Sequence, residues 1–288
     1  GFIGSNLIDT LLGIGHTVVC VDNESSDAHD KPYWNNDSIN IRGDIRDYNL
    51  MSSAMKGVDF VFHLAAEARI QPSIENPINA VSINDLGTAT VLQCARENQV
   101  KKVMFSSTSA AYGRNDSPNV ETQYPDPLNP YSVTKIAGEK LCKMYTDLFG
   151  MKTVTFRYFN VYGDRAPRTG QYSPVIGIFF RQRDASEDLT IVGDGEQRRD
   201  FVHVSDVVSA NLAAAFNDVD NEHYGQVYNV GSGKNYSVNE IASWISDKQV
   251  HLPERVGEVR VSLANIDKIK NVFGWEPKVD LEEWVRSR

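Results

Sequence analysis

Residues 1–22 read GFIGSNLIDTLLGIGHTVVCVD, and this stretch decides the fold. Gly1 and Gly4 lead directly into a helical pattern of apolar residues, namely Leu7, Ile8, Leu11 and Leu12. An apolar run over residues 17–21 follows, which predicts a buried strand ending in Asp22. The N–H groups at a helix start are free and the helix dipole favours an anion, so the segment Gly1-Phe2-Ile3-Gly4 predicts a phosphate-binding turn.

The acid after the second strand of such a fold selects the nucleotide. In a dinucleotide-binding fold this carboxylate holds the adenosine ribose hydroxyls, and it would repel a 2′-phosphate. A G-x-x-G start alone is weak, but the strand and Asp22 at this distance strengthen it. We therefore expect NAD rather than NADP as the cofactor.

The following residues continue the alternation of strands and helices. We predict short strands at 41–45, 60–64, 102–105 and 153–156, and helices at about 79–98 and 131–148. Strands that alternate with helices at this spacing predict an α/β fold with a doubly wound parallel sheet, which binds ligands at the carboxyl ends of its strands.

Beyond residue 163 the regular alternation ends, which suits a smaller substrate-binding lobe. Phe201–Phe216, with Ser205 as its predicted N-cap, and Val227–Val230 are predicted as a helix and a strand that return to the main sheet. Ser237 and Glu240 form a capping box that begins a lobe helix. We expect an NAD-binding domain over residues 1–162 with returning segments at about 201–231, interleaved with a lobe over residues 163–288.

Composition excludes several classes of protein. The chain has 288 residues, 41% hydrophobic, and a net charge of −9, which argues against partners such as nucleic acid or membrane surfaces. No apolar run reaches the roughly 20 residues of a membrane span. Cys20, Cys94 and Cys142 show no C-x-x-C spacing, so we expect buried thiols and a cytoplasmic protein.

Tyr131 and Lys135 are the first candidates for catalysis. Residues at i and i+4 share one helix face, and a nearby ammonium favours the phenolate and lowers a tyrosine pKa towards that of a general base. The pattern is also compatible with an ordinary surface pair. Four hydroxyl residues, Ser106 to Ser109, close an apolar strand on the ligand side, and this makes a catalytic role for the pair more plausible.

Seven short motifs follow one another along the chain. They are Gly-Phe-Ile-Gly, Val-Asp-Asn, Gly-Asp-Ile, Ser-Ser-Thr-Ser-Ala-Ala-Tyr-Gly, Pro-Tyr-Ser-Val-Thr-Lys, Arg-Tyr-Phe-Asn-Val-Tyr-Gly and Arg-Asp-Phe-Val-His-Val. With them the chain resembles the extended short-chain dehydrogenase/reductases, and within these the UDP-hexose 4-epimerases that accept N-acetylated sugars. That family opens with a strand and Thr-Gly-Gly-x-Gly-x-x-Gly, of which only Gly1 and Gly4 are present, so we interpret the sequence as lacking the first, central strand.

The resemblance implies a role for many residues. It implies NAD contacts by Gly1, Phe2, Ile3, Gly4, Asp22, Asn23, Asp44, Ile45, Leu64, Ala65, Ala66, Asn84, Ser106, Tyr131, Lys135 and Tyr158. It implies catalysis by Thr108, Tyr131 and Lys135, and UDP-sugar contacts by Thr108, Asn160, Arg199, Arg255, Glu258 and Ser262. The alternatives are ion pairs of Arg199 with Asp200 and of Arg255 with Glu258, and a solvated strand at Ser262.

The resemblance also implies a reaction without a metal. Tyr131 takes the proton of the sugar 4-hydroxyl while C4 passes its hydride to NAD, and the 4-keto sugar turns and takes the hydride back. Relatives that dehydrate or decarboxylate carry an acid where this chain has Ser109 and Ala110, so epimerisation is favoured. The remaining alternatives are a net dehydrogenase or reductase and a non-catalytic NAD-sensing protein.

The resemblance further implies a homodimer with a four-helix bundle. The two helices of each subunit would be those at 79–98 and 131–148. Apolar residues beyond one sheet-facing stripe, such as Val91, Leu92, Leu141 and Met144, support this expectation.

Overall fold

A four-stranded parallel sheet forms the centre of the protein. The computed structural model describes residues 1–26, 32–167, 174–253 and 259–288. The strand order is β3 (Phe60–His63), β4 (Lys102–Thr108), β5 (Thr153–Tyr158) and β9 (Gln226–Val230). Every neighbouring pair in this sheet is parallel. β1 (Val19–Asp22) and β2 (Ile39–Arg42) form a separate parallel pair.

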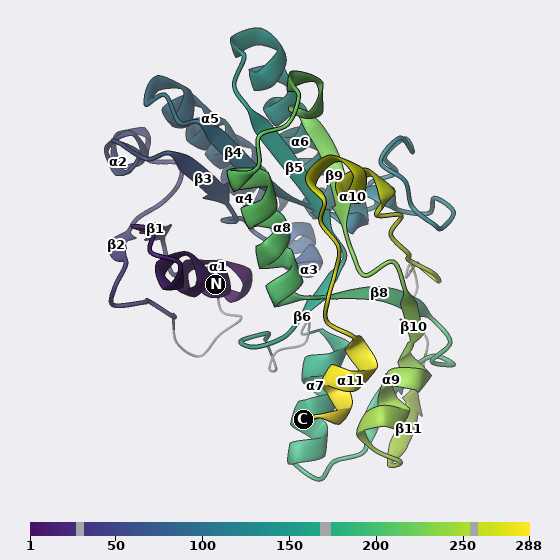
Figure 1. Ribbon diagram of the computed structural model, residues 1–288. Coiled ribbons are helices and arrows are strands. Elements are labelled where there is room, and N and C mark those ends of the chain that lie inside the picture. The colour runs from purple at the N-terminus through teal and green to yellow at the C-terminus, as the bar shows by residue number, and fades with distance from the viewer. Residues whose placement is uncertain (27–31, 168–173, 254–258) are drawn as a thin grey trace.

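Helices cover both faces of this sheet, because strand residues alternate between two cores (Figure 1). Met104 and Phe156 pack among side chains of α8 (Val204–Phe216) and α10 (Asp267–Phe273), whereas Val103 and Phe105 pack among side chains of α5 (Gly87–Glu97) and α6 (Pro130–Phe149). The predicted α/β fold with a parallel, doubly wound sheet is confirmed.

Further helical segments precede or connect the strands and helices of the main sheet. They are α1 (Phe2–Gly13), α2 (Tyr48–Ala54), α3 (Ile70–Glu75), α4 (Pro77–Val81), the 3-10 helices Ser109–Tyr112 and Asn221–His223, and a π-helix, Ser82–Leu86, that joins α4 to α5. The predicted helix at about 79–98 thus exists, with a wider turn in its middle. Such π turns often occur at functional sites.

Local sequence explains where α6 begins and ends. Asn129 caps the helix by accepting from the N–H of Ser132, Pro130 occupies the first turn, and the Ser132 side chain completes a capping box. Gly150 ends the helix in the left-handed conformation, with φ 67°.

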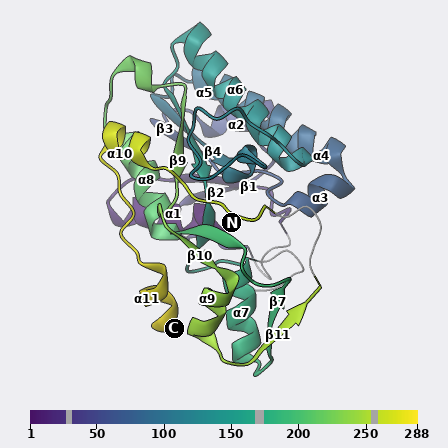
Figure 2. The ribbon, with the colours of Figure 1, turned by 90° about the vertical axis from the view of Figure 1, so that its right-hand side faces the viewer.

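A second group of elements lies beyond the main sheet (Figures 1 and 2). β8 (Arg198–His203) lies between β6 (Asn160–Tyr162) and β10 (Asn235–Ser237), and β7 (Leu189–Val192) pairs with β11 (Gln249–Leu252). Helices α7 (Val175–Asp184), α9 (Val238–Ile245) and α11 (Leu281–Arg286) surround a core of their own. The capping box of Ser237 and Glu240 at the start of α9 is confirmed.

Three predictions about local structure are wrong. Residues 198–203 form β8 rather than a helix start, because the backbone of Phe201 and Val202 pairs with β6. The N-cap of α8 is consequently His203, whose Nδ1 accepts from the N–H of Ser205. Cys94 and Cys142 are buried as expected, but Cys20 is only half-buried because it lies in the separate β1–β2 pair.

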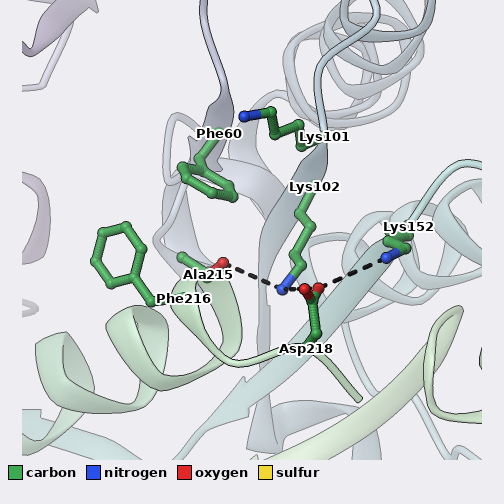
Figure 3. Close-up of a pocket in the computed structure, with 7 residues that line it drawn as sticks. All are labelled: Phe60, Lys101, Lys102, Lys152, Ala215, Phe216 and Asp218. Atoms are coloured by element: carbon green, nitrogen blue, oxygen red, sulfur yellow. Dashed lines mark hydrogen bonds and ion pairs between the residues drawn. The ribbon is translucent and has the colours of Figure 1, made fainter. Parts of the chain in front are cut away.

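A hollow at the amino ends of β3 and β4 contains a buried cation (Figure 3). Lys102 donates to the carbonyls of Ala214, Ala215 and Asn217 at the end of α8, and its ammonium lies 3.2 Å from the Asp218 carboxylate. A cation at a helix C-terminus stabilises the last carbonyls. We therefore assign a structural role to this hollow, which lies at the sheet edge opposite the carboxyl ends.

Among the described helices, none has the length and apolarity needed to cross a bilayer.

Candidate active site

The predicted site residues follow the carboxyl ends of parallel strands. Asp22 ends β1, Asp44 follows β2, Leu64 follows β3, Thr108 ends β4 and Tyr158 ends β5. Because β3, β4 and β5 are parallel, their ends meet at one edge of the sheet. This edge is where open α/β sheets bind ligands.

The predicted catalytic residues Thr108, Tyr131 and Lys135 form a cluster at the start of α6, in which Thr108 and Lys135 are buried and Tyr131 is half-buried. The backbone N–H of Tyr131 donates to Ser73 Oγ at 3.1 Å, which fixes the first turn of the helix. Lys135 is 4% exposed, and its Nζ donates to the Ser106 carbonyl at 2.8 Å and lies 6.0 Å from the centre of the Tyr131 ring. Thr108 is also buried, and its hydroxyl lies beside the Tyr131 phenol.

Burial dominates the electrostatics of this cluster. Burial raises the pKa of Tyr131, and the neighbouring Thr108 hydroxyl lowers it in part. Burial also lowers the pKa of Lys135 to about 8. The pKa of Tyr131 thus shifts upward, whereas the spacing to Lys135 predicts a downward shift, and Lys135 Nζ donates to the Ser106 carbonyl.

The start of α1 retains the features of an anion site. Its N-cap is Gly1, and no side chain caps the helix. A Cβ added at Gly4 would meet Leu64 Cδ1 at 3.7 Å, so the helix start lies beside the loop after β3, where Ala65 is exposed. The Asp22 carboxylate accepts from the N–H of Glu24 at 2.7 Å. An uncapped helix start, an acid after β1 and a buried lysine fit the phosphates, the adenosine ribose and the nicotinamide ribose of NAD.

The predicted adenine contacts already have partners within the protein. Arg46 donates to both carboxylate oxygens of Asp44, at 2.9 and 2.6 Å, and holds the pKa of this carboxyl at about 2. Asn23 donates to the same carboxylate at 3.3 Å. Ile45 is buried against Gly87, where an added Cβ would approach its Cδ1 to 2.5 Å. The roles of Asn23, Asp44 and Ile45 towards adenosine stay predictions.

Asn84 and Tyr158 are buried supports of the site. The Asn84 amide accepts from the N–H of Glu67 and donates to the Glu67 carbonyl and to Thr134 Oγ1, so it joins the loop after β3 to α6. The Tyr158 hydroxyl is bonded to Ser106 Oγ at 3.3 Å and to Asn211 at 2.8 Å. The polar groups of Asn84 and Tyr158 therefore form hydrogen bonds to these neighbouring residues of the protein.

The predicted substrate contacts lie around β8. Asn160 donates to the Asp200 carbonyl at 2.8 Å, and Arg199 donates to the carbonyls of Arg198 and Arg260. The alternative of a surface ion pair between Arg199 and Asp200 is wrong, because Asp200 is fully buried. Ser262 lies beside β8, where its N–H donates to the Arg198 carbonyl at 3.0 Å. Arg255 and Glu258 lie outside the described residues.

The structure adds a buried ion pair that the sequence analysis did not predict. Arg157 Nε and Nη2 donate to the two carboxylate oxygens of Glu139 at 2.8 and 2.7 Å, and Ser107 Oγ donates to the same carboxylate at 2.5 Å. Both charged side chains are almost fully buried. The signal was available in part, because Glu139 follows Lys135 by four residues on the same face of the helix. Arg157 carries no comparable signal.

Fold and site together define an α/β protein that binds a dinucleotide beside a tyrosine–lysine pair. A model of the NAD dependent epimerase/dehydratase family matches residues 1–231. The chain is 35% identical to the UDP-N-acetyl-alpha-D-glucosaminuronate decarboxylase of Bacillus cytotoxicus, over 100% of this chain and 93% of that protein. The chain belongs to the NAD-dependent epimerase/dehydratase family, and its cofactor is NAD.

Two solved structures are similar over almost the whole chain. The UDP-glucose 4-epimerase of Thermotoga maritima with UDP-glucose has a TM-score of 0.90 at 35% identity, covering 99% of this chain and 94% of that one. The UDP-N-acetylglucosamine 4-epimerase of Methanobrevibacter ruminantium in complex with UDP-N-acetylmuramic acid has a TM-score of 0.90 at 34% identity, covering 99% and 93%. This chain is accordingly an enzyme of a family that acts on UDP-sugars.

Proposed function

We propose that this protein is a UDP-hexose 4-epimerase that interconverts UDP-GlcNAc with UDP-GalNAc, and UDP-Glc with UDP-Gal. One observation carries the proposal: the Thr108, Tyr131 and Lys135 cluster has no carboxylate at the adjoining positions 109 and 110. This cluster supplies proton transfer at an alcohol and no further acid.

Each residue of the cluster has a distinct task. The Tyr131 phenolate accepts the proton of the sugar 4-hydroxyl and later returns it, and Thr108 holds the same oxygen by a hydrogen bond. Lys135, whose pKa burial lowers to about 8, binds the nicotinamide ribose and stabilises the phenolate when charged. NAD, when bound, supplies reversible hydride transfer at C4.

The 3-10 helix after β4 argues against elimination and decarboxylation. Thr108 caps this helix by accepting from the N–H of Ala110 at 3.1 Å, so positions 109 and 110 directly adjoin the catalytic hydroxyl. In dehydrating and decarboxylating relatives these positions carry acids, whereas Ser109 and Ala110 provide no carboxylate. A decarboxylase is nevertheless the second candidate, since one relative with that name is 35% identical.

The substrate preference rests on Ser262. In the family a bulky tyrosine at this position restricts the sugar to UDP-Glc and UDP-Gal, and a small residue admits the acetamido group. Ser262 is small, and its Oγ is buried with no hydrogen-bond partner within the described part of the chain. The small side chain at this position supports the proposal that the site accepts a substituent at C2 of the sugar.

Product analysis distinguishes the candidates. We would incubate the full-length protein separately with UDP-Glc, UDP-GlcNAc and UDP-glucuronic acid, and resolve the products by chromatography and proton NMR. Epimerase activity predicts UDP-Gal and UDP-GalNAc without added NAD, because the cofactor is restored in each turnover. Release of CO₂ from the acid, or net formation of NADH, would instead support a decarboxylase or a dehydrogenase.

A single substitution tests the sugar preference. Ser262→Tyr introduces a rigid phenol into the space of the acetamido group, and overpacking of this kind costs about 1–3 kcal/mol or more. We expect the UDP-GlcNAc reaction to fall by at least about tenfold and the UDP-Glc reaction to remain within about threefold of wild type. Ser262→Ala is the matched control and should retain both reactions. Equal loss of both, or of neither, would refute this role.

We also propose a homodimer that buries the outer face of α4, α5 and α6. Val91 and Leu92, which the sequence analysis expected in the interface, are buried within the single chain in the core below α5, so that expectation is wrong. Other apolar residues on these helices and the π-helix are instead exposed, namely Ile78 (82%), Val81 (47%), Leu86 (56%) and Val133 (50%). Exposed apolar side chains on neighbouring helices are typical of an interface.

A further inference from the structure

Asp200 is a buried carboxylate at the centre of β8. Its exposed fraction is 0%. Oδ1 accepts from the N–H and the hydroxyl of Ser232 at 2.7 and 2.8 Å, and Oδ2 accepts from the N–H groups of Gly233 and Ala264 at 3.1 and 3.0 Å. Hydrogen bonds to an ionised acceptor are about twice as strong as neutral ones. This set of donors therefore holds the neighbouring segments firmly.

The donors belong to two segments that are far apart in the sequence. Ser232 and Gly233 follow β9 of the main sheet, whereas Ala264 lies in the segment 260–265. Gly231 lies where they meet, and a Cβ there would approach Ala264 Cβ to 2.6 Å and Asp200 Oδ2 to 2.9 Å. β8, the end of β9 and the segment 260–265 are thus in direct contact at this carboxylate.

The segment 260–265 is also bonded to neighbours other than Asp200. The Arg260 side chain pairs with Asp194, Ser117 Oγ donates to the Val261 carbonyl, and Asn235 donates to the Ser262 carbonyl. The Arg198 N–H donates to the Arg260 carbonyl, and the Ser262 N–H donates to the Arg198 carbonyl. Beyond Ser262 the backbone bonds change partner, because the Leu263 carbonyl and the Asn265 N–H pair with Asn119. The bond from Ala264 to the Asp200 carboxylate consequently adds a contact to β8 two residues after Ser262.

The neighbours of Asp200 are the residues with predicted roles towards the sugar nucleotide. Asn160 donates to the Asp200 carbonyl, Arg199 precedes Asp200 in β8, and Ser262 lies two residues before the Ala264 donor. The residues with predicted roles towards NAD, such as Asp22 and Lys135, lie on other elements. A change at Asp200 should therefore affect the two ligands differently.

We propose that Asp200 is a positioning residue for the sugar nucleotide. It holds the segment that carries Ser262 in register with β8, and so determines how closely residue 262 approaches the C2 substituent of the sugar. Asp200 acts through its neighbours and does not touch the substrate. The inference rests on the proposed function for the sugar, but its effect on UDP binding is independent of which sugar is turned over.

Asp200→Asn provides the first test. An amide presents its own N–H groups to two of the donors, so about half of the bonds are lost. We expect KM for the UDP-sugar and the Kd of UDP to rise by about tenfold or more, while kcat stays within about fivefold and the NAD content per protein, read by absorbance after denaturation, is unchanged. An unchanged UDP affinity, or a parallel loss of NAD, would overturn the proposal.

Asp206→Asn is the matched control. Asp206 is also buried and accepts from a backbone N–H, that of Val279 at 3.0 Å, but its recorded partners lie outside the segment 260–265. We expect unchanged KM, kcat and UDP affinity for this variant. A rise in KM equal to that of Asp200→Asn would show a general effect of buried aspartates and overturn the proposal.

A double-mutant cycle tests the link to residue 262. In the wild-type background, Ser262→Tyr should lower the turnover of UDP-GlcNAc sharply. In the Asp200→Asn background the segment is less fixed, so the fold-loss caused by Ser262→Tyr should be at least about five times smaller. Additive effects would overturn the inference. If the wild-type protein does not turn over UDP-GlcNAc, the proposed sugar preference fails, and the UDP affinity of Asp200→Asn still decides the inference.

Ser232→Ala keeps the test valid if Asp200→Asn does not fold. This variant removes the hydroxyl bond to Asp200, together with the hydroxyl contacts to the Lys234 backbone, and leaves the three backbone bonds to Asp200. We expect a rise of about two- to threefold in KM and in the Kd of UDP, without loss of NAD. No change in either quantity would overturn the proposal.

Discussion

Tyr131 occupies a position that several contacts fix before any ligand binds. Its backbone N–H donates to Ser73 Oγ, and its carbonyl accepts from Thr134 Oγ1. Because burial raises the pKa of the phenol, the neutral form is favoured in the protein alone. The residue is placed for proton transfer, and its ionisation requires a positive charge nearby.

Tyr131→Phe removes only the hydroxyl group. We expect turnover of the UDP-sugar to fall by about 10²-fold or more, as is usual for loss of a positioned acid–base group, while the fold and the NAD content are retained. Initial rates together with absorbance of the denatured protein measure both quantities. Activity within a few-fold of wild type would contradict the assignment.

Lys135 should make the stability of the cofactor-free protein depend on pH. Its pKa is about 8 in the folded protein against 10.5 ordinarily, so between these values the unfolded chain binds more protons. The contribution of Lys135 to the free energy of unfolding therefore rises with pH across this window, by at most about 3 kcal/mol. Lys135→Met should abolish this rise and increase stability below pH 8.

Urea unfolding at pH 7.5 and pH 9.5 checks this prediction. Lys143→Met is the matched control, because the Lys143 side chain is 52% exposed on the same helix. The control should retain the pH dependence of wild type. An equal pH dependence in Lys135→Met would show that another group causes it.

At the scale of elements, α6 connects the catalytic residues to the sheet. Tyr131 and Lys135 lie in its first turns, and Glu139 lies one turn later, paired with Arg157 of β5 and with Ser107 of β4. The ion pair thus fixes α6 against the two strands whose ends carry the site. Its burial makes it costly to break, because one removed partner leaves an uncompensated charge.

Glu139→Leu should destabilise the protein strongly. Loss of the carboxylate leaves the buried Arg157 guanidinium unpaired, at a cost of about 3–5 kcal/mol, whereas the double substitution Glu139→Leu/Arg157→Leu should recover most of it. Asp147→Ala is the control, because it breaks the exposed pair with Lys143 on the same helix and should change stability by less than about 0.5 kcal/mol. Chemical denaturation measures all three; a double variant no more stable than Glu139→Leu would contradict the argument.

At the scale of the whole molecule, the helices of the main sheet leave an apolar outer face. α4, α5 and α6 lie side by side (Figure 2), and Ile78, Leu86 and Val133 extend from them or from the π-helix into solvent. We expect a dimer mass by light scattering at micromolar concentration. Leu86→Glu should shift the protein to a monomer, because it places a charge in the centre of the contact.

Val250→Glu is the control for this prediction. Val250 is 41% exposed on β11, which belongs to the other group of elements. It should leave the dimer intact. A monomeric wild-type protein, or a dimer that persists in Leu86→Glu, would contradict the proposed interface.

The sequence alone determined the features that depend on neighbouring residues. The caps of α6 and α9, the strand that ends in Asp22 and the common face of Tyr131 and Lys135 all follow from local backbone geometry, since spacing along one element fixes these relations. The motif order indicated the family, which the similarity to known proteins confirms. It also gave the strand ends where the site lies.

Only the tertiary structure decided the properties that depend on distant segments. Val91 and Leu92 are buried because α2 and β4 pack over them with α5, and periodicity within one helix cannot show which faces are covered. Burial of the phenol in the folded protein raises the pKa of Tyr131, and Lys135 donates to the Ser106 carbonyl, neither of which the spacing of the two residues shows. Asp200 has its donors 32 to 64 residues away in the chain, and such contacts exist only once the folded backbone brings those segments together.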